Sequence, residues 1–339
     1  MLVRTRVRRV AATATLVALA VGGLSMSRAQ AQNKLAVSIA VPAYFNDDDS
    51  WDRAINASVV TYIVGHPDTP ANGKFVAAKE LTTHLAQAKA KGKTTLIYVT
   101  AGYDKIGWEE VANRIDSAFD AYPNADGVFI DEINYDQCDK YKSLSAGSGS
   151  IKGVRDRHPG KQIVLNPGAP MLNCYQGLAD GYLNLERADK DVQAWTDNVN
   201  LPGNTPYYAW MFKPDIRSQI WQMVHSVPSG DVDKAVDAAV ARNASVLYVT
   251  PDVLPNPYDK LPDDSVWNKI IDRVQQYATG KVPLPAVKQL VIPANAATTT
   301  IKASADTAAT PTTRKPTATT KKATTKATTK TTTKTTKKR

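Results

Sequence analysis

The segment Gly127-Val-Phe-Ile-Asp131-Glu132 joins a short apolar run directly to two carboxylic acids. Such a run between helical segments is typical of a buried parallel strand. An unpaired carboxylate is costly to bury, so packing alone does not explain two acids at the carboxyl end of this strand. In parallel α/β sheets and barrels, ligands bind at the carboxyl ends of the strands. The segment therefore indicates a catalytic or ligand-binding pair, with simple solvent exposure or pairing to a lysine as the alternative.

Strands and helices alternate on both sides of this segment. β-favouring runs predict strands over residues 35–45, 59–64, 94–100, 127–130, 162–165, 181–185, 220–224 and 246–250. Apolar residues at helical spacing predict helices between them, most clearly over residues 75–91, 108–121, 232–242 and 266–277. Eight alternations in a chain of this size predict the α/β class and a single (β/α)8 barrel. An open doubly wound sheet, the alternative, would usually carry a glycine-rich turn after its first strand, where this chain has Pro42-Ala43-Tyr44.

The two ends of the chain differ in composition from this core. Residues 1–31 begin with arginines, continue with an apolar stretch and end in small residues, as a secretory signal peptide does. Residues 296–339 are nearly all Thr, Ala, Lys and Pro, which cannot bury enough apolar surface to fold, so we expect a disordered cationic tail. The folded domain is expected over residues 33–290 of a secreted, extracellular protein, with association with the cell wall as a further expectation.

The basic charge of the chain belongs to these ends. The net charge is +10, from 42 basic and 32 acidic residues, but residues 1–31 and 314–339 hold 15 of the basic residues and no acid. The remainder has 27 basic and 32 acidic residues and gives no indication of a nucleic-acid enzyme. The tail alone is expected to bind an anionic cell-wall polymer or another polyanion.

The cysteine and histidine content limits the chemistry. Cys138 and Cys174 are the only cysteines, and in an exported protein two cysteines most simply form one disulfide, with two buried thiols as the alternative. The four histidines are widely scattered, so we expect no metal site and no cofactor. A G-x-S-x-G serine nucleophile motif is absent from the sequence.

Polar and aromatic residues follow the predicted strands and would meet at one face of a barrel. They are Tyr44, His66, Tyr103, Asp131 with Glu132, Asn166, Glu186, His225, and Asp252 with Asn256. Acids beside flat rings are what glycoside hydrolysis needs, because one carboxylic acid protonates the leaving oxygen and another acts as nucleophile or base. Asp131 and Glu132 would point to opposite sides of a regular strand, so only one would face the barrel axis unless the chain twists there.

The six tryptophans fall into two groups. Trp51, Trp108, Trp221 and Trp267 occupy helix or strand positions and are expected in the core. Trp195 and Trp210 lie in a long polar stretch and are candidates for stacking on a sugar, with core packing as the alternative.

Six short motifs occur in an order that resembles the spherulin-4 (spherulation-specific) family, which includes the glycosidases of glycoside hydrolase family 135. The motifs are Val41-Pro42-Ala43-Tyr44, Tyr98-Val99-Thr100 with Tyr103, the Gly127 to Glu132 segment, Asn166-Pro167-Gly168, Glu186, and His225 with the block from Tyr248 to Tyr258. The loop that begins Gly65-His66-Pro67 departs from the family pattern, which has an N-P-x-x-G-P-G-like turn there. This departure bears on substrate preference, because the loop would border the cleft.

The resemblance implies a (β/α)8 barrel that hydrolyses an α-linked N-acetylgalactosamine-containing exopolysaccharide, as an endo-α-1,4-N-acetylgalactosaminidase does. It implies that Asp131, Glu132 and Glu186 are the catalytic acids. The cleft would be lined by Tyr44, Tyr103, Asn166, His225, Asp252 and Asn256. We expect a monomer whose partner is its polysaccharide substrate. A non-catalytic glycan-binding protein of the cell surface or matrix, anchored by the cationic tail, is the alternative.

Overall fold

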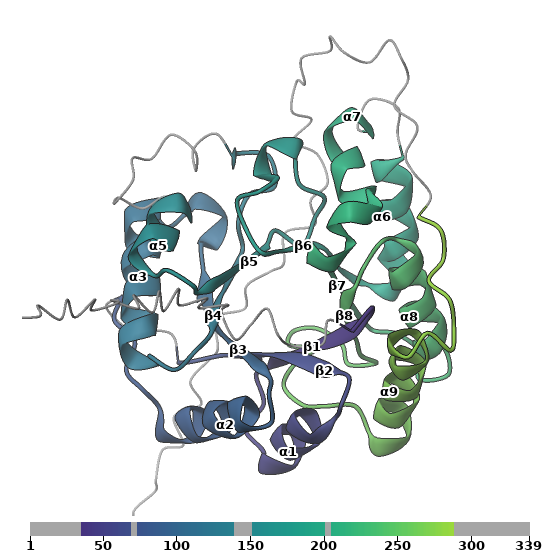
Figure 1. Ribbon diagram of the computed structural model, residues 1–339, viewed down its shortest axis with the longest axis horizontal. Helices are drawn as coiled ribbons and strands as arrows, with labels where there is room; N and C mark the ends of the chain where they lie inside the picture. Colours follow the sequence, from purple (N-terminus) through teal and green to yellow (C-terminus); the bar gives the residue numbers. More distant parts are fainter. Residues whose placement is uncertain (1–34, 69–72, 139–150, 201–204, 288–339) are drawn as a thin grey trace, which may run out of the picture. The chain divides into compact units, whose positions relative to one another are not determined.

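The computed structural model describes residues 35–68, 73–138, 151–200 and 205–287, which are the coloured parts of Figure 1. The expected signal peptide and the expected cationic tail lie outside the described residues. Both therefore stay predictions from composition.

Eight parallel strands close into a barrel in chain order, and the first strand pairs with the last. The strands are β1 (Ser38–Ala43), β2 (Val60–Gly65), β3 (Thr94–Thr100), β4 (Gly127–Asp131), β5 (Gln162–Asn166), β6 (Gly181–Ala188), β7 (Ile220–His225) and β8 (Val246–Val249). The helices lie outside this ring (Figure 1). This is the predicted (β/α)8 barrel.

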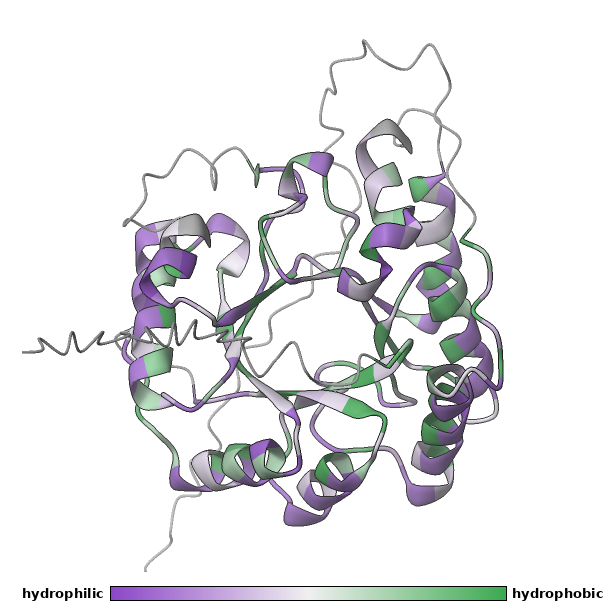
Figure 2. Cartoon of the chain, in the orientation of Figure 1, coloured by the Kyte–Doolittle hydropathy of each residue, from purple (hydrophilic) through white to green (hydrophobic). Residues whose placement is uncertain are grey.

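The helices follow the strands around the barrel. The α-helices are α1 (Asp48–Asn56), α2 (Lys79–Ala90), α3 (Trp108–Ala121), α5 (Ile151–Arg157), α6 (Val192–Val199), α7 (Thr205–Tyr208), α8 (Val232–Ala241) and α9 (Asp264–Ala278). Short 3-10 helices are η2 (Gly102–Asp104), η3 (Asn173–Tyr175), η4 (Asp189–Asp191), η5 (Ala209–Phe212) and η6 (Pro214–Gln219). Figure 2 shows hydrophilic residues on the outward sides of the helices, as expected for helices that bury an apolar stripe against the strands.

Local sequence signals account for the helix limits and for the buried stripe. Asp47 caps α1, since its side chain accepts a hydrogen bond of 2.7 Å from the backbone nitrogen of Ser50. In α3, Val111, Ile115 and Ala118 recur at helical spacing and are fully buried. Burial of such side chains stabilises the barrel by about 1.5–3 kcal/mol for each large aliphatic group.

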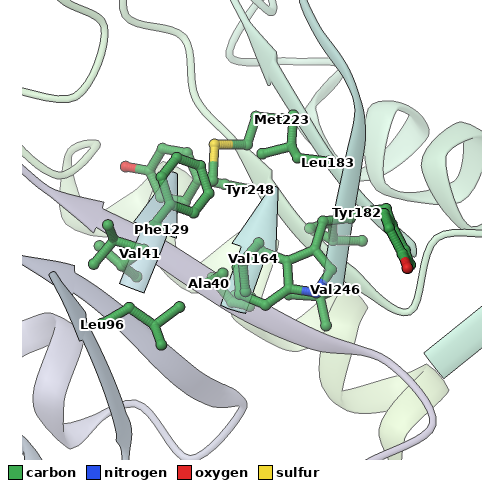
Figure 3. Packing of buried hydrophobic residues seen from close by; sticks show 14 of the residues in the cluster. Ala40, Val41, Leu96, Phe129, Val164, Tyr182, Leu183, Met223, Val246 and Tyr248 are labelled. Carbon is green, nitrogen blue, oxygen red and sulfur yellow. The ribbon is translucent and has the colours of Figure 1, made fainter. Parts of the chain in front are cut away.

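Side chains fill the interior of the barrel. Leu96, Phe129, Met223 and Tyr248, from four different strands, pack together there and are at most 2 % exposed (Figure 3). The tryptophans predicted for the core are all buried, namely Trp51, Trp108, Trp221 and Trp267. Because the interior is packed, a ligand can bind only above it, at the carboxyl ends of the strands.

Cys138 and Cys174 form the predicted disulfide. Cys138 lies in the loop after β4, and Cys174 lies in η3, within the connection between β5 and β6. The bridge therefore joins two neighbouring loops at the end of the barrel where the polar residues gather.

We expect the bridge to add to the stability of the folded barrel. It closes a sequence separation of 36 residues, which corresponds to about 3–4 kcal/mol in the chain-entropy treatment. Replacing both cysteines by alanine should lower the unfolding temperature by roughly 6–16 °C. Calorimetry with and without reductant checks this, and the double variant should be insensitive to reductant. An unfolding temperature of the parent protein that reductant does not change would contradict the assignment.

Candidate active site

Asp131 ends β4, and neighbouring strands hold its carboxylate through two donors. Tyr98 of β3 donates its hydroxyl to Oδ2 at 2.8 Å, and Asn166 of β5 donates from Nδ2 to Oδ1 at 2.6 Å. The strand register places these groups together, because Asp131 lies directly opposite Thr100 of β3 and Asn166 of β5. Both oxygens of the acid are therefore fixed from the two sides of its strand.

Glu132 faces the same side as Asp131, because the backbone turns sharply between them. Its φ angle of 55° is in the left-handed region, which is uncommon for a residue with a side chain. Its Oε2 accepts a hydrogen bond of 2.6 Å from the hydroxyl of Thr100. Tyr98, which binds Asp131, and Thr100, which binds Glu132, are two residues apart on β3 and share one face of that strand. The chain thus twists as it leaves β4. This twist is the condition under which the sequence analysis expected both acids to face the barrel axis.

Glu186 lies within β6 instead of following it, since the strand continues three residues beyond the predicted limit at residue 185. Its carboxylate accepts two hydrogen bonds. Asn166 donates from Nδ2 to Oε2 at 2.6 Å, and Tyr258 donates its hydroxyl to Oε1 at 2.7 Å. Asn166 is 2 % exposed and contacts both Glu186 and Asp131 through the same nitrogen.

A β-bulge directs Glu186 into the barrel. The pairing of β6 with β7 shifts between Leu183 and Leu185, so Glu186 lies opposite Met223. Leu183 and Met223 both belong to the packed interior (Figure 3). If the same residues paired without a bulge, Glu186 would lie opposite Val224, whose side chain alternates to the other face. The position of Glu186 at the mouth therefore depends on the bulge.

Asp131 and Glu186 are close neighbours. Their oxygens that contact Asn166 each lie 2.6 Å from the same nitrogen, so these two oxygens are at most twice that distance apart. Burial, followed by the negative charge of Glu186, raises the pKa of Asp131 to about 8. Asp131 therefore keeps its proton at neutral pH.

Tyr44, His66, Tyr98 and Tyr258 surround the two acids with rings. The Tyr44 ring lies 5.6 Å from that of Tyr98 and 5.7 Å from that of Tyr258, while the His66 ring lies 4.7 Å from Tyr44 and 4.6 Å from Tyr98. Burial, with the charges of the acids adding to it, raises the pKa of all three tyrosines well above 10.0. Burial lowers the pKa of His66. These four side chains, which form a wall of rings around the acids, are therefore uncharged at neutral pH. The three phenol hydroxyls remain hydrogen-bond donors.

Tyr98 and Tyr258 are site residues that the sequence analysis quoted in motifs but did not assign to the cleft. The available signals were weak, because Tyr98 lies two residues before Thr100 on an inward face and Tyr258 lies in an irregular loop. Asn256, predicted to line the cleft, is exposed, and its Oδ1 accepts a hydrogen bond of 3.1 Å from the backbone nitrogen of Tyr258. Asn256 therefore shapes the turn that presents Tyr258.

Tyr103 lies within electrostatic range of all three acids. Burial raises its pKa, and the charges of Asp131, Glu132 and Glu186 raise it further. Its backbone nitrogen donates to the carbonyl oxygen of Glu132 at 2.6 Å. Tyr103 and Asp104 have φ angles of 49° and 63°, and adjacent strained residues of this kind are typical of functional sites.

His225 ends β7 and Asp252 follows β8, at the same end of the barrel. His225 is 6 % exposed, burial lowers its pKa, and its Nδ1 lies 3.0 Å from the hydroxyl of Ser226. Asp252 has Lys260 at 3.9 Å. Within the described ranges neither side chain hydrogen-bonds to the three acids, so their assignment to the cleft stays a prediction.

The prediction that Trp195 and Trp210 are exposed sugar-stacking rings is wrong. Trp195 belongs to α6, is 6 % exposed and donates its indole N–H to the carbonyl oxygen of Asn184 at 3.1 Å. Trp210 is 4 % exposed and donates to the carbonyl oxygen of Met171 at 2.9 Å. Both rings pack in the core with their polar atoms satisfied, which outweighs the polar character of the surrounding sequence.

The other histidines and acids are dispersed. His84 stacks on Trp51 at 4.6 Å, and His158 contacts Asp116 of α3. In the described part of the chain, no three His, Cys, Asp or Glu side chains gather as metal ligands would. The same residues contain no helix with the length and apolar character that a bilayer span requires.

The structure is a (β/α)8 barrel with a pair of carboxyl groups at the carboxyl ends of its strands. The sequence shows which family of such barrels the chain belongs to. Residues 38–274 match the family model described as spherulation-specific family 4. The chain belongs to this family. No curated protein matches the chain by sequence.

Solved structures include similar barrels, of which Sph3 shows the same fold. The crystal structure of Aspergillus clavatus Sph3 in complex with GalNAc is similar over 71 % of this chain and 98 % of that one, with a TM-score of 0.50 and 19 % identity. A family GH18 chitinase from Chromobacterium violaceum aligns over 71 % of this chain and 84 % of its own, with a TM-score of 0.43 and 10 % identity. At these identities the likeness concerns the fold alone.

Proposed function

We propose that this protein is a glycoside hydrolase that uses Asp131 and Glu186 as its reacting pair. The observation that carries the proposal is the bridge through Asn166, which holds two carboxyl groups side by side, with the pKa of Asp131 raised to about 8 by burial and by the charge of Glu186. A carboxylic acid that keeps its proton at neutral pH, next to a second carboxyl group and a wall of aromatic rings, is what hydrolysis of a glycosidic bond requires. Membership of the spherulation-specific family is consistent with this reaction.

In this mechanism Asp131 gives its proton to the glycosidic oxygen as the bond to the anomeric carbon breaks. Glu186 attacks the anomeric carbon through its carboxylate, which yields a covalent glycosyl-enzyme. Asp131, now ionised, takes a proton from the water that then hydrolyses this intermediate. Glu132 does not react, and its negative charge helps to keep the proton on Asp131.

The spacing of the pair favours a retaining outcome. The nearest oxygens of Asp131 and Glu186 lie within twice 2.6 Å of each other. Carboxyl groups in inverting enzymes are about 6.5–9.5 Å apart, because a water molecule must fit between the sugar and the base. The shorter separation suits direct attack by Glu186.

The substrate class that we propose is an α-linked polysaccharide containing N-acetylgalactosamine. Support comes from the resemblance of the motifs and from Sph3 of Aspergillus clavatus, whose structure was solved in complex with GalNAc. We also propose that the protein acts outside the cell, because its cysteines are paired and disulfides persist in oxidising compartments.

Reducing-end release tests the proposal. The purified protein is incubated with galactosamine-, glucosamine- and neutral-sugar polymers, and the product from any polymer that is cleaved is followed by proton NMR. We expect release from the galactosamine-containing polymer, with the fresh product retaining the configuration of the substrate. Binding without release from any polymer would replace the hydrolase with a glycan-binding protein. Fresh product of inverted configuration would exclude Glu186 as the nucleophile.

We expect the Tyr258 hydroxyl to matter for turnover. Tyr258→Phe removes one of two donors to Glu186, and a hydrogen bond to a charged group contributes about 1.5–3 kcal/mol. The value of kcat should fall by about 10–100-fold with KM little changed.

Tyr248→Phe is the matched control for this variant. Tyr248 is fully buried, its ring lies 5.9 Å from that of Tyr258, and its hydroxyl has no hydrogen bond to Glu186. Its variant should keep the kcat of the parent protein. Equal effects of the two substitutions would mean that Tyr258 contributes packing only.

A further inference from the structure

Among the Phe, Tyr and Trp side chains of the described ranges, only those of Tyr103 and Tyr135 are exposed. Their exposed fractions are 38 % and 37 %, whereas the other Phe, Tyr and Trp side chains there are buried or half-buried. Tyr103 lies in the loop after β3 and Tyr135 in the loop after β4, so both belong to the end of the barrel that holds the acids. Exposed apolar surface beside a functional site is typical of a binding surface.

The loop that carries Tyr103 is joined to the loop that carries Tyr135. The side chain of Asn134 donates a hydrogen bond to the carboxylate of Asp104, so the residues next to the two tyrosines are in direct contact. On its other side Tyr103 is bound through its backbone to Glu132 at 2.6 Å. Tyr103 therefore lies between the acids and the contact that leads to Tyr135.

The segment around Tyr135 is also held from the far side. The backbone nitrogen of Leu172 donates to the carbonyl oxygen of Tyr135 at 3.1 Å, and the hydroxyl of Tyr175 donates to the carbonyl oxygen of Asn134. The disulfide between Cys138 and Cys174 joins the same two loops a few residues further on. A backbone restrained in this way presents the exposed ring with little conformational entropy left to lose on binding.

The chemistry around the two rings suits a carbohydrate. An aromatic ring offers a flat apolar face, and the phenol hydroxyls and the flanking Asp104, Asn134 and Asp136 offer hydrogen-bonding groups between and beside the faces. A protein partner would need a wider continuous patch than two separate rings with polar residues between them. A chain of sugar units alternates apolar faces with hydroxyl groups and matches this pattern.

We propose that Tyr135 forms an outer sugar subsite, continuous with Tyr103, that binds a unit of the glycan chain beyond those at the acids. This inference rests on the proposed hydrolase function and extends it to a requirement for a chain of several units. Tyr135 acts in binding and in the choice of chain length, and it takes no part in the bond cleavage itself.

The experiment compares Tyr135→Ala with the parent protein on α-1,4-linked N-acetylgalactosamine oligosaccharides of increasing length. We measure kcat/KM for each length, and we measure affinity in the Glu186→Gln background by calorimetry. Tyr135→Ala should lose about 3- to 10-fold on the longest oligosaccharides and nothing on the shortest one that is cleaved. Tyr135→Phe keeps the ring and should match the parent protein. Leu284→Ala removes an apolar side chain of similar exposure, 39 %, after α9 and should have no effect.

Each outcome decides one point. A loss in Tyr135→Ala that is equal at all lengths, or no loss at any length, would overturn the subsite while leaving the hydrolase intact. A parent protein that neither cleaves nor binds the oligosaccharides would overturn the proposed substrate, and the subsite would fall with it. Loss confined to long chains, with Tyr135→Phe unaffected, supports the subsite.

Discussion

Glu186→Gln is expected to abolish turnover, with kcat reduced by about 10³-fold or more, while the barrel stays folded. The amide has the shape of the carboxylate and can still accept a hydrogen bond at this position, but it is a far weaker nucleophile. Neither Asn166 nor Tyr258, the two donors to this side chain, is left without a polar neighbour. The unfolding temperature should therefore change little, which calorimetry measures beside the activity assay.

A second readout of the same variant does not depend on activity. The charge of Glu186 is one of the causes that raise the pKa of Asp131, so its removal should lower that pKa. Carboxyl-carbon NMR of the parent protein and the variant measures the shift. Full activity in Glu186→Gln would exclude Glu186 as a reacting group. An unchanged pKa of Asp131 would mean that the two acids are not the close pair that the structure describes.

Asp131→Asn is expected to be nearly inactive and, at high pH, more stable than the parent protein. Loss of the general acid should lower kcat by about 10²–10⁴-fold. The stability effect follows from burial, which raises the pKa of this acid from 3.8 in the ordinary state to about 8 in the folded protein. A group whose pKa is raised in the folded protein stabilises the fold fully at pH values below its ordinary pKa. This stabilisation is lost as the pH rises through the pKa of the folded state.

Asparagine does not ionise, so Asp131→Asn does not lose this stability as the pH rises. Its gain in unfolding temperature over the parent protein should be largest above pH 8 and should vanish below the ordinary pKa of 3.8. Asp252→Asn offers a control at the same end of the barrel, since burial also raises the pKa of Asp252 but no hydrogen bond joins its side chain to the pair in the described structure. A gain in Asp131→Asn that is the same at all pH values would refute the raised pKa.

The barrel itself could be predicted from the sequence because its signals are local. The strand over 94–100 and the helix over 108–121 have the predicted limits, since a β-branched run and a regular apolar spacing each end sharply. The disulfide followed from composition alone. The helix α6 was missed because its apolar residues are few and it lies among polar ones, so packing of Trp195 decides its conformation.

The acids could be predicted from the sequence as well, but not their arrangement. Strand ends indicated Asp131, Asn166 and Glu186, which the structure brings into contact. The left-handed backbone conformation at Glu132 could not be predicted from the residue type. Tyr258 reaches Glu186 from 72 positions further along the chain, so only the closed barrel reveals it. The arrangement of the site depends on contacts between segments that are distant in the sequence, and local sequence patterns do not predict such contacts.

The bulge in β6 has a consequence for how such barrels diverge. The register shift between Leu183 and Leu185 places Glu186 opposite Met223 and not opposite Val224. Loss of one residue from the bulge would restore regular pairing and leave Glu186 opposite Met223. Pairing of all the residues present without the bulge would instead turn Glu186 toward the helices and away from Asp131. A relative with one residue fewer between Leu183 and Glu186 would thus still present its acid at the barrel mouth, provided that its strand pairs without a bulge.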